Sequence, residues 1–243
     1  MKQIAKKSFF IAGTDTGVGK TEVSLGLMES FKRRDYCVAG MKPIACGGME
    51  SSQGLENEDA SRILAAISAD FWRREAWCAT PRRYEIVNPY MFKLPIAPHI
   101  AAEKENVNIN IASIERQLRK IESNAEVTIV EGVGGWQVPI SQQSTMQDLV
   151  KVLNIPIILT VGLKLGALNH SLLTYQAIKN AGLHCCAWVA NTLDSEMSCV
   201  TENIQAINQR FDCPCLGVIP DLALPISSQL LADFLDVDIL LSM

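Results

Sequence analysis

The segment Gly13–Thr21 combines small residues with a lysine and a terminal hydroxyl, a pattern that could bind phosphate. Small residues let the backbone wrap an anion, so that its N–H groups and those of a following helix N-terminus point at it. Lys20 would then neutralise the terminal phosphates of a nucleotide, and the Thr21 hydroxyl would coordinate Mg²⁺. The usual pattern is G-x-x-x-x-G-K-[ST], whose first glycine should be residue 14, where this chain has Thr14. The sequence therefore predicts a phosphate-binding loop of unusual spacing.

Three charged side chains elsewhere could act beside that loop. Glu131 ends an apolar run and could give a second metal contact, Asp59 could give a third, and Lys42 follows another apolar run and could neutralise further oxyanions. Taken singly, each has a plainer interpretation: a solvated strand terminus, a carboxylate at a helix start and a surface lysine. Together with the loop, they predict a site for phosphoryl transfer.

The elements that must position these residues alternate along the chain. Apolar runs predict strands at Ser8–Ala12, Tyr36–Lys42, Val127–Glu131, Pro156–Gly162, Cys185–Asn191 and Cys215–Ile219. Helical spacing predicts helices at Lys20–Arg34, Asn57–Asp70, Asn110–Ser123, Thr145–Leu153, Ala167–Ala181 and Ser195–Arg210. The stretch Ala76–Pro98 is expected to form a long loop near the ligand-binding edge of the sheet. We expect one α/β domain over residues 1–243, with a doubly wound, mostly parallel sheet, helices on both faces and the P-loop NTPase-like architecture. In such a sheet, Lys42 should lie beside the loop.

Composition narrows the classes of function. The chain has 243 residues, of which 48% are hydrophobic and 20% charged, as in a globular protein. Its net charge of −4 gives no electrostatic footprint for nucleic acid. It has no apolar run of the roughly 18 residues needed to span a membrane, and Phe9–Gly13 is too short for a signal-peptide core. The eight cysteines are scattered, so we expect reduced thiols in a cytoplasmic protein.

Several ordered stretches together resemble the dethiobiotin synthetase family. The family's loop reads G-T-D-T-x-V-G-K-T, as residues 13–21 do here, so the early glycine is the family's own variant. Further matching stretches are Ala39–Pro43, Asn57–Ala60, Val87–Tyr90, Pro98–His99, Val130–Trp136, Val161–His170 and Trp188–Asn191. The resemblance extends from residue 8 to about residue 220.

The resemblance implies an ATP- and Mg²⁺-dependent ligase of biotin biosynthesis. Its substrates would be 7,8-diaminopelargonate, CO₂ and ATP. One amine would form a carbamate, ATP would phosphorylate it to a carbamic-phosphoric anhydride, and the second amine would close the ring to give dethiobiotin, ADP and phosphate. The reaction needs positioning and charge neutralisation rather than a dedicated nucleophile, because the amines supply the nucleophile.

The resemblance also implies roles for individual residues. Lys42, Lys20 and Thr16 would act in catalysis. The metal would be held by Thr21, Asp59 and Glu131. Nucleotide contacts would come from Gly17, Val18, Gly19, Lys20, Thr21, Asp59, Glu131, Gly134, Asn191 and Pro220. Substrate contacts would come from Thr16, Lys42, Cys46, Leu165, Gly166 and Asn169. The family binds the substrate's tail carboxylate partly through the second subunit, which implies a homodimer with active sites at its interface.

One departure and several alternatives accompany this interpretation. The family commonly has serine where this chain has Cys46, and a thiol is the weaker hydrogen-bond donor. A switch ATPase of the same fold would carry an additional lysine early in the loop, where this chain has Gly13–Asp15. A cobyrinate amide synthetase would need a glutaminase domain, for which 243 residues leave no room. An ATP-binding module without carboxylase activity remains the alternative.

Overall fold

The computed structural model describes residues 6–51, 54–74, 83–222 and 226–242, and its central feature is a parallel sheet of six strands. In spatial order the strands are β10 (Cys215–Ile219), β9 (Cys185–Thr192), β8 (Ile157–Leu163), β1 (Lys7–Gly13), β7 (Val127–Glu131) and β2 (Val38–Met41). Strands β1, β7 and β8 are buried almost throughout. Continuous burial of this kind is typical of a parallel sheet covered on both faces.

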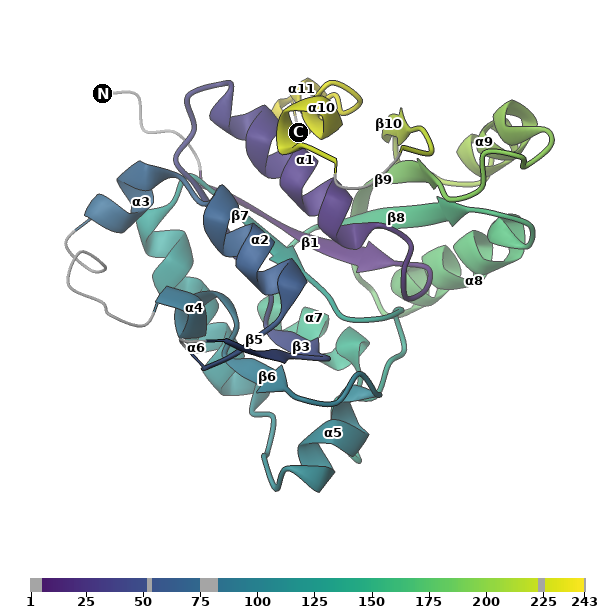
Figure 1. The fold of residues 1–243 in the computed structure, drawn as a ribbon. Coiled ribbons are helices and arrows are strands. Elements are labelled where there is room, and N and C mark those ends of the chain that lie inside the picture. Colours follow the sequence, from purple (N-terminus) through teal and green to yellow (C-terminus); the bar gives the residue numbers. More distant parts are fainter. Residues whose placement is uncertain (1–5, 52–53, 75–82, 223–225, 243) are drawn as a thin grey trace.

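Helices cover the two faces of the sheet (Figure 1). One face carries α1 (Lys20–Lys32) and α2 (Glu58–Ala66), and the other carries α6 (Ile111–Asn124), α7 (Met146–Leu153) and α8 (Ala167–Asn180). Helix α9 (Val200–Asn208) packs beside α8. The predicted doubly wound α/β fold is therefore confirmed. Within the described ranges, no helix has both the length and the apolar character needed to cross a membrane.

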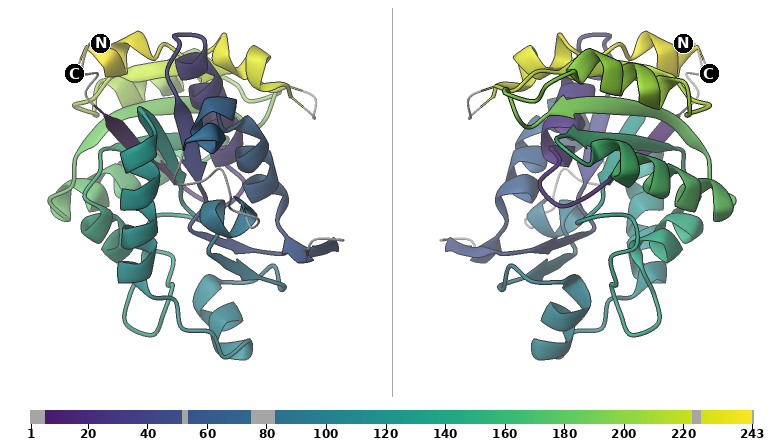
Figure 2. Two further views of the ribbon diagram at one scale, coloured as in Figure 1. Left: turned by 90° about the vertical axis from the view of Figure 1, so that its left-hand side faces the viewer. Right: turned by 90° about the vertical axis from the view of Figure 1, so that its right-hand side faces the viewer.

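The C-terminal helices α10 (Ser228–Ala232) and α11 (Asp238–Leu241) pack along α1, as Figure 2 shows at the top of each view. Arg33 and Arg34 at the end of α1 pair with Asp233 at 2.6 Å and Asp238 at 2.7 Å. These ion pairs join the C-terminal helices to the end of the helix that follows the phosphate loop.

Smaller elements form a second layer beside the site. Strand β3 (Ile44–Cys46) pairs in parallel with β6 (Tyr90–Phe92), and β4 (Met49–Ser51) pairs with β5 (Gly54–Glu56) as an antiparallel hairpin. The short helices are α3 (Ala69–Arg73), α4 (Arg83–Val87) and α5 (Pro98–Lys104).

Three local predictions were wrong. The expected loop at Ala76–Pro98 contains α4, β6 and the start of α5; its residues 76–82 lie outside the described ranges. The expected helix Asn57–Asp70 breaks at Ile67, whose backbone is extended, and Ser68 instead accepts a hydrogen bond from the Val38 amide. Helix α9 starts only at Val200, because Cys199 has a left-handed backbone with φ of 58°.

Lys42 was predicted to lie beside the phosphate loop, and its side chain lines the same cavity as that loop. Strand β7 lies between β1 and β2, so Lys42 approaches the loop from two strands away. The long lysine side chain spans that separation, as the contacts below show.

Candidate functional site

The phosphate loop joins the buried end of β1 to the start of α1. Gly17 and Gly19 have φ of 71° and 86°, in the left-handed region that favours glycine. A Cβ atom on Gly19 would lie 2.1 Å from Asn191 Nδ2, so the close approach of these two segments requires glycine. Lys20 Nζ donates to the Asp15 carbonyl at 2.9 Å, which folds the lysine back over the loop.

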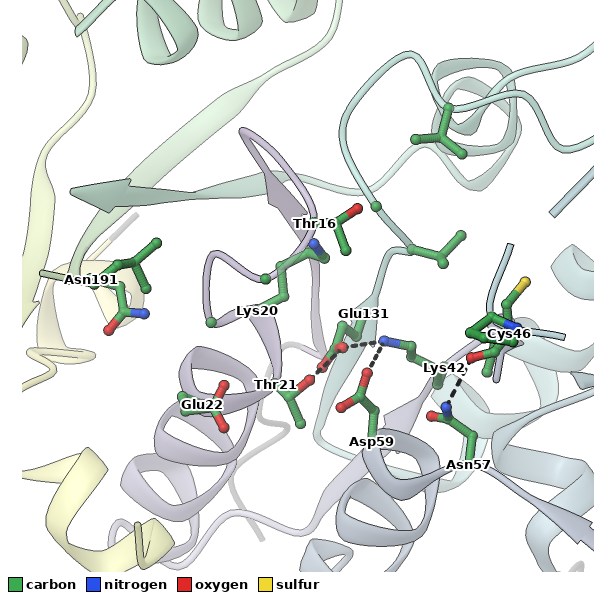
Figure 3. Close-up of a pocket in the computed structure, with 18 of the residues that line it drawn as sticks. Thr16, Lys20, Thr21, Glu22, Lys42, Cys46, Asn57, Asp59, Glu131 and Asn191 are labelled. Carbon is green, nitrogen blue, oxygen red and sulfur yellow. Dashed lines mark hydrogen bonds and ion pairs between the residues drawn. The ribbon is translucent and has the colours of Figure 1, made fainter. Parts of the chain in front are cut away.

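Four side chains from different elements meet beside the loop (Figure 3). The Thr21 hydroxyl donates to Glu131 Oε1 at 2.9 Å. Lys42 Nζ donates to that same oxygen and to Asp59 Oδ2, the latter at 2.8 Å. The structure therefore brings together Thr21, Lys42, Asp59 and Glu131, which the sequence placed at one site.

Sheet register explains this convergence. Ile11 of β1 is level with Glu131 of β7, and Met41 of β2 is level with Val130. Because the strands are parallel, their carboxyl ends meet at one edge of the sheet, where ligands of open α/β proteins bind. Asp59 is the second residue of α2, whose N-terminus faces the same edge.

Burial strengthens the electrostatic interactions between the charged side chains of this cluster. Glu131 is 0% exposed and Lys42 3%, so neither is solvated. Burial opposes the charge on Lys42, but the Glu131 and Asp59 carboxylates outweigh it and raise the Lys42 pKa. Burial likewise opposes the charge on Asp59, and the contact with Lys42 outweighs it and lowers the Asp59 pKa. The ion pair is held in its charged form.

Lys20 behaves differently. Burial, reinforced by repulsion from Lys42, lowers the pKa of Lys20 to about 8. Its Nζ bonds to a carbonyl and to no carboxylate within hydrogen-bond distance among the described side chains. An anion with several oxygens at the loop would supply the negatively charged partner that Lys20 lacks.

A cavity of about 720 Å³ opens over this cluster. The predicted site residues that line it are Thr16, Gly17, Gly19, Lys20, Thr21, Lys42, Cys46, Asp59, Glu131, Gly134, Asn191 and Pro220. Asn191 lies on the far side of Lys20 from Lys42 (Figure 3). The cavity therefore has two ends, one at Asn191 and one at Lys42 and Cys46.

Four predicted residues are placed differently. Val18 does not line the cavity, and its carbonyl accepts a 2.9 Å hydrogen bond from Asn191 Nδ2. Leu165, Gly166 and Asn169 also lie outside the cavity wall of this subunit. Leu165 is 96% exposed at the start of α8, a surface that a second subunit could cover.

Part of the cavity wall was not predicted from the sequence. The residues Glu22, Asn57, Pro95–Pro98, Val133, Val138, Thr192, Leu193, Asp221, Leu222 and Ile226 also line it. Proximity in sequence to Thr21, Asp59, Gly134, Asn191 and Pro220 could have indicated most of them. The segment Pro95–Pro98 belongs to the stretch Ala76–Pro98, which was expected near the ligand-binding edge of the sheet, and it follows β6, which pairs with β3.

The set Thr21, Asp59 and Glu131 suits Mg²⁺. Within the described part of the chain, no three His, Cys, Asp or Glu side chains are grouped to hold a metal ion unaided. Mg²⁺ does not require this, since it keeps several waters and takes oxygens from substrate phosphates. Glu131 Oε2 is buried and has no hydrogen-bond partner among the described residues. A cation is the natural partner for that orphaned carboxylate oxygen.

The parallel sheet, the glycine-rich loop at the end of β1 and the acidic strand end define a P-loop nucleotide-binding α/β protein. Solved structures share this fold at low identity. MinD of Pyrococcus horikoshii, in complex with Mg-ADP, has a TM-score of 0.55 at 13% identity, covering 96% of this chain and 88% of that one. MinD of Aquifex aeolicus has a TM-score of 0.52 at 14% identity, covering 95% and 88%.

Sequence comparisons are more specific. An AAA domain family model matches residues 7–225. The ATP-dependent dethiobiotin synthetase BioD of Cellvibrio japonicus is 41% identical over 91% of this chain and 92% of its own length. That of Aromatoleum aromaticum is 40% identical over 89% and 92%. The chain therefore belongs to the ATP-dependent dethiobiotin synthetase family.

Proposed function

We propose that this chain catalyses the ATP-dependent carboxylation and ring closure of 7,8-diaminopelargonic acid with CO₂, giving dethiobiotin, ADP and phosphate. The observation that supports this most is the convergence of Lys20, Lys42, Thr21, Asp59 and Glu131 at the base of one cavity. Cationic side chains and a metal-binding oxygen set are what two reacting anions, a carbamate and a triphosphate, require.

The chemistry proceeds in three steps. One amine of the substrate attacks CO₂ and loses a proton, giving a carbamate. A carbamate oxygen then attacks the γ-phosphorus of ATP, and ADP leaves. The second amine attacks the carbamate carbon, phosphate leaves with its bridging oxygen, and the cyclic urea closes. The overall reaction consumes one ATP and forms two C–N bonds.

The cationic residues make the approach of the anions possible. Lys20 reaches the terminal phosphates from the loop. Its pKa is lowered in the free protein, and the negative charge of the phosphates would favour its protonated form. Lys42 reaches from β2 towards both the carbamate and the γ-phosphate. Thr16 faces the reacting atoms from the loop, and Cys46 contacts the substrate beyond Lys42. These residues position the reactants and neutralise charge, and none of them acts as a nucleophile.

Thr21, Asp59 and Glu131 would hold Mg²⁺. When bound, Mg²⁺ supplies further neutralisation of the phosphate oxygens. Thr21 and Glu131 are already joined by a hydrogen bond, and Asp59 reaches them through Lys42. Lys42 bridges these two carboxylates and partly neutralises them in the free protein.

The nucleotide lies along the loop in this proposal. Gly17 and Gly19 line the cavity and would present backbone N–H groups to the phosphates, together with the amide of Val18 between them, and Gly134 lies in the same cavity wall. Asn191 and Pro220 bind the adenine at the other end of the cavity. An Asn amide has both a donor and an acceptor and can match the donor and acceptor edge of adenine.

A homodimer would complete the substrate site. Leu165, Gly166 and Asn169 are on the surface at the N-terminus of α8, away from this subunit's own cavity. The N–H groups of that helix start suit the tail carboxylate of a substrate bound in the partner's cavity. The exposed Leu165 would be covered in the same contact.

The enzyme would work in the cytoplasm on small molecules. Cys37, Cys185, Cys186 and Cys213 are free and buried, and Cys46, Cys199 and Cys215 are free and more accessible. Free thiols are the usual state in a reducing compartment.

The proposal is tested by product formation. The protein is incubated with diaminopelargonate, bicarbonate, ATP and Mg²⁺, and dethiobiotin is sought by mass spectrometry. We expect product to appear only when all four are present. ATP hydrolysis that is equally fast without diaminopelargonate, with no dethiobiotin formed, would instead indicate a switch ATPase or an ATP-binding module.

A further inference from the structure

A chain of hydrogen bonds runs from the backbone of Lys42 to the start of α2 through two residues that do not line the cavity. We propose that these two residues, Tyr84 and Asn88, are positioning residues that hold Lys42 and Asp59 in register for the reaction. The inference rests on the proposed function for its catalytic meaning. The hydrogen-bonded chain itself stands on geometry alone.

Asn88 holds the backbone of Lys42. Its side chain is 2% exposed, and its Nδ2 donates to the Lys42 carbonyl at 2.6 Å. The Lys42 amide in turn donates to the Val87 carbonyl at 2.8 Å. Both backbone polar groups of Lys42 are therefore bound by the end of α4, although β2 and α4 are far apart in sequence.

Tyr84 joins this arrangement to α2. Its hydroxyl donates to Asn88 Oδ1 at 3.2 Å and accepts a 2.7 Å hydrogen bond from the Asn57 amide. Asn57 is the N-cap of α2, where its Oδ1 accepts from the Ala60 amide at 3.3 Å. The hydrogen-bonded chain thus ends two residues before Asp59.

Asn57 also extends the chain towards the substrate end of the cavity. Its Nδ2 donates to the Cys46 carbonyl at 3.2 Å, so the α2 N-cap is tied to β3 as well as to Tyr84. The backbones of Lys42 and Cys46 and the N-cap of the helix that carries Asp59 are therefore joined through Tyr84, Asn88 and Asn57. Tyr84 and Asn88 do not line the cavity, so they would act as positioning residues.

The Tyr84 hydroxyl also lies 3.7 Å from Met91 Sδ, and Asn88 Nδ2 lies 3.4 Å from the Tyr90 carbonyl, but both distances are longer than those within the hydrogen-bonded chain. The tyrosine hydroxyl has a single proton, and donating it to Asn88 Oδ1 makes the Asn88 Nδ2 group face the Lys42 carbonyl. Loss of the hydroxyl would leave the Asn57 amide and Asn88 Oδ1 without partners. Since displacement of about 1 Å in an active site can cost on the order of 100-fold in rate, small shifts of Lys42 against Asp59 matter.

A nearby tyrosine provides a matched control. The Tyr90 hydroxyl accepts a 3.0 Å hydrogen bond from the Asn110 amide, at the start of α6 and away from the cluster. Tyr84→Phe and Tyr90→Phe therefore each remove one hydroxyl that accepts from a backbone N–H at the N-cap of a helix. Only the first breaks the path between Lys42 and α2.

The test compares both variants with the wild-type protein. Hydrogen–deuterium exchange should rise in peptides covering residues 42–48 and 57–61 for Tyr84→Phe, and in neither for Tyr90→Phe. In steady-state kinetics, Tyr84→Phe should lower kcat roughly tenfold or more while KM for ATP changes less than about twofold, because the phosphate loop is untouched. Asn88→Ala should give the same split.

Three results would overturn the inference. Unchanged exchange at residues 42–48 and 57–61 in Tyr84→Phe would remove the chain as a structural connection. Unchanged kcat, or an equal loss in Tyr90→Phe, would remove its role in positioning. If wild-type protein forms no dethiobiotin, the proposed function fails together with the catalytic meaning of the chain, and the exchange data still decide whether the connection exists.

Discussion

The Thr21 hydroxyl donates a 2.9 Å hydrogen bond to Glu131 Oε1, although the two residues are 110 positions apart in the sequence. Thr21 starts the helix after the loop, and Glu131 ends a strand that pairs with β1. This contact joins the phosphate-binding segment to the acidic end of the sheet. Glu131 Oε2 is buried and has no hydrogen-bond partner among the described residues, so a cation could pair with it.

Replacing Glu131 with glutamine should therefore weaken the effect of Mg²⁺ on nucleotide binding. Glutamine keeps the shape but loses the negative charge, and Mg²⁺ prefers carboxylate oxygen. We expect the increase in ATP affinity on adding Mg²⁺, measured by titration calorimetry, to fall at least about tenfold. Glu126→Gln, at the opposite end of β7, is the control and should keep the wild-type response. An identical Mg²⁺ response in Glu131→Gln would exclude this carboxylate as a ligand.

Lys42→Ala should largely abolish turnover while the chain still folds. The variant loses the cation that faces the carbamate and γ-phosphate, and it leaves Glu131 buried without its charged partner. Unpairing a buried charge is costly, so the free energy of unfolding in EDTA should fall by about 3 kcal/mol. Chemical denaturation and the product assay measure the two effects.

Lys93→Ala is the matched control for Lys42→Ala. Lys93 also pairs with a glutamate, Glu50, at 2.7 Å, but both side chains are exposed, at 64% and 77%. Such surface pairs contribute little to stability. Wild-type turnover in Lys42→Ala would remove Lys42 from its proposed role.

Much of this site could be predicted from the sequence because its signals are local. The run Val127–Glu131 is a buried strand with the predicted bounds, and the loop at Gly13–Thr21 has the predicted context. The order of strands in the sheet depends on contacts between residues that are distant in sequence. The position of β7 between β1 and β2 was therefore not predicted. Tyr84 and Asn88 were likewise invisible as positioning residues, because their importance comes from contacts with Asn57 and Lys42, distant in sequence.

The affinity for ATP should fall as pH rises through about 8. Burial lowers the pKa of Lys20 to about 8, so the free protein loses this proton in a range where the unfolded chain keeps it. Bound triphosphate favours the charged ammonium, so above that pH nucleotide binding must take up a proton. A fluorescent-nucleotide titration from about pH 7 to about pH 9.5 should show weakening that is absent in Lys20→Met. A flat wild-type profile would contradict the assignment.

The same pKa shift predicts how this group affects stability. The folded pKa lies below the unfolded one, so between about pH 8 and about pH 10.5 the unfolded state binds more protons. The contribution of Lys20 to the free energy of unfolding therefore rises with pH across that window, by about 3 kcal/mol in total. Denaturant titrations of wild type and Lys20→Met should differ in slope there. If the free energies of unfolding of wild type and Lys20→Met changed equally with pH, folding would not lower the pKa of Lys20.

Leu165→Glu should disrupt the proposed dimer. Leu165 is 96% exposed in the single subunit, and a charge placed in an apolar contact opposes association. The wild-type protein should scatter with about twice the subunit mass of 26.7 kDa, and Leu165→Glu with the single mass and a raised KM for diaminopelargonate. Val152→Glu, on α7, is the control for an added surface charge. A wild-type mass near 26.7 kDa would contradict the shared site.

The central claim is that the cavity brings a carbamate oxygen to the γ-phosphate of ATP, and an isotope measurement tests it most directly. The reaction is run briefly with ¹⁸O-labelled CO₂, before the label exchanges with water, and the inorganic phosphate is analysed by mass spectrometry. If the carbamate oxygen attacks phosphorus, each phosphate released with dethiobiotin carries one ¹⁸O atom from CO₂, and the urea carbonyl keeps the other. Phosphate without label, formed in step with dethiobiotin, would contradict the account.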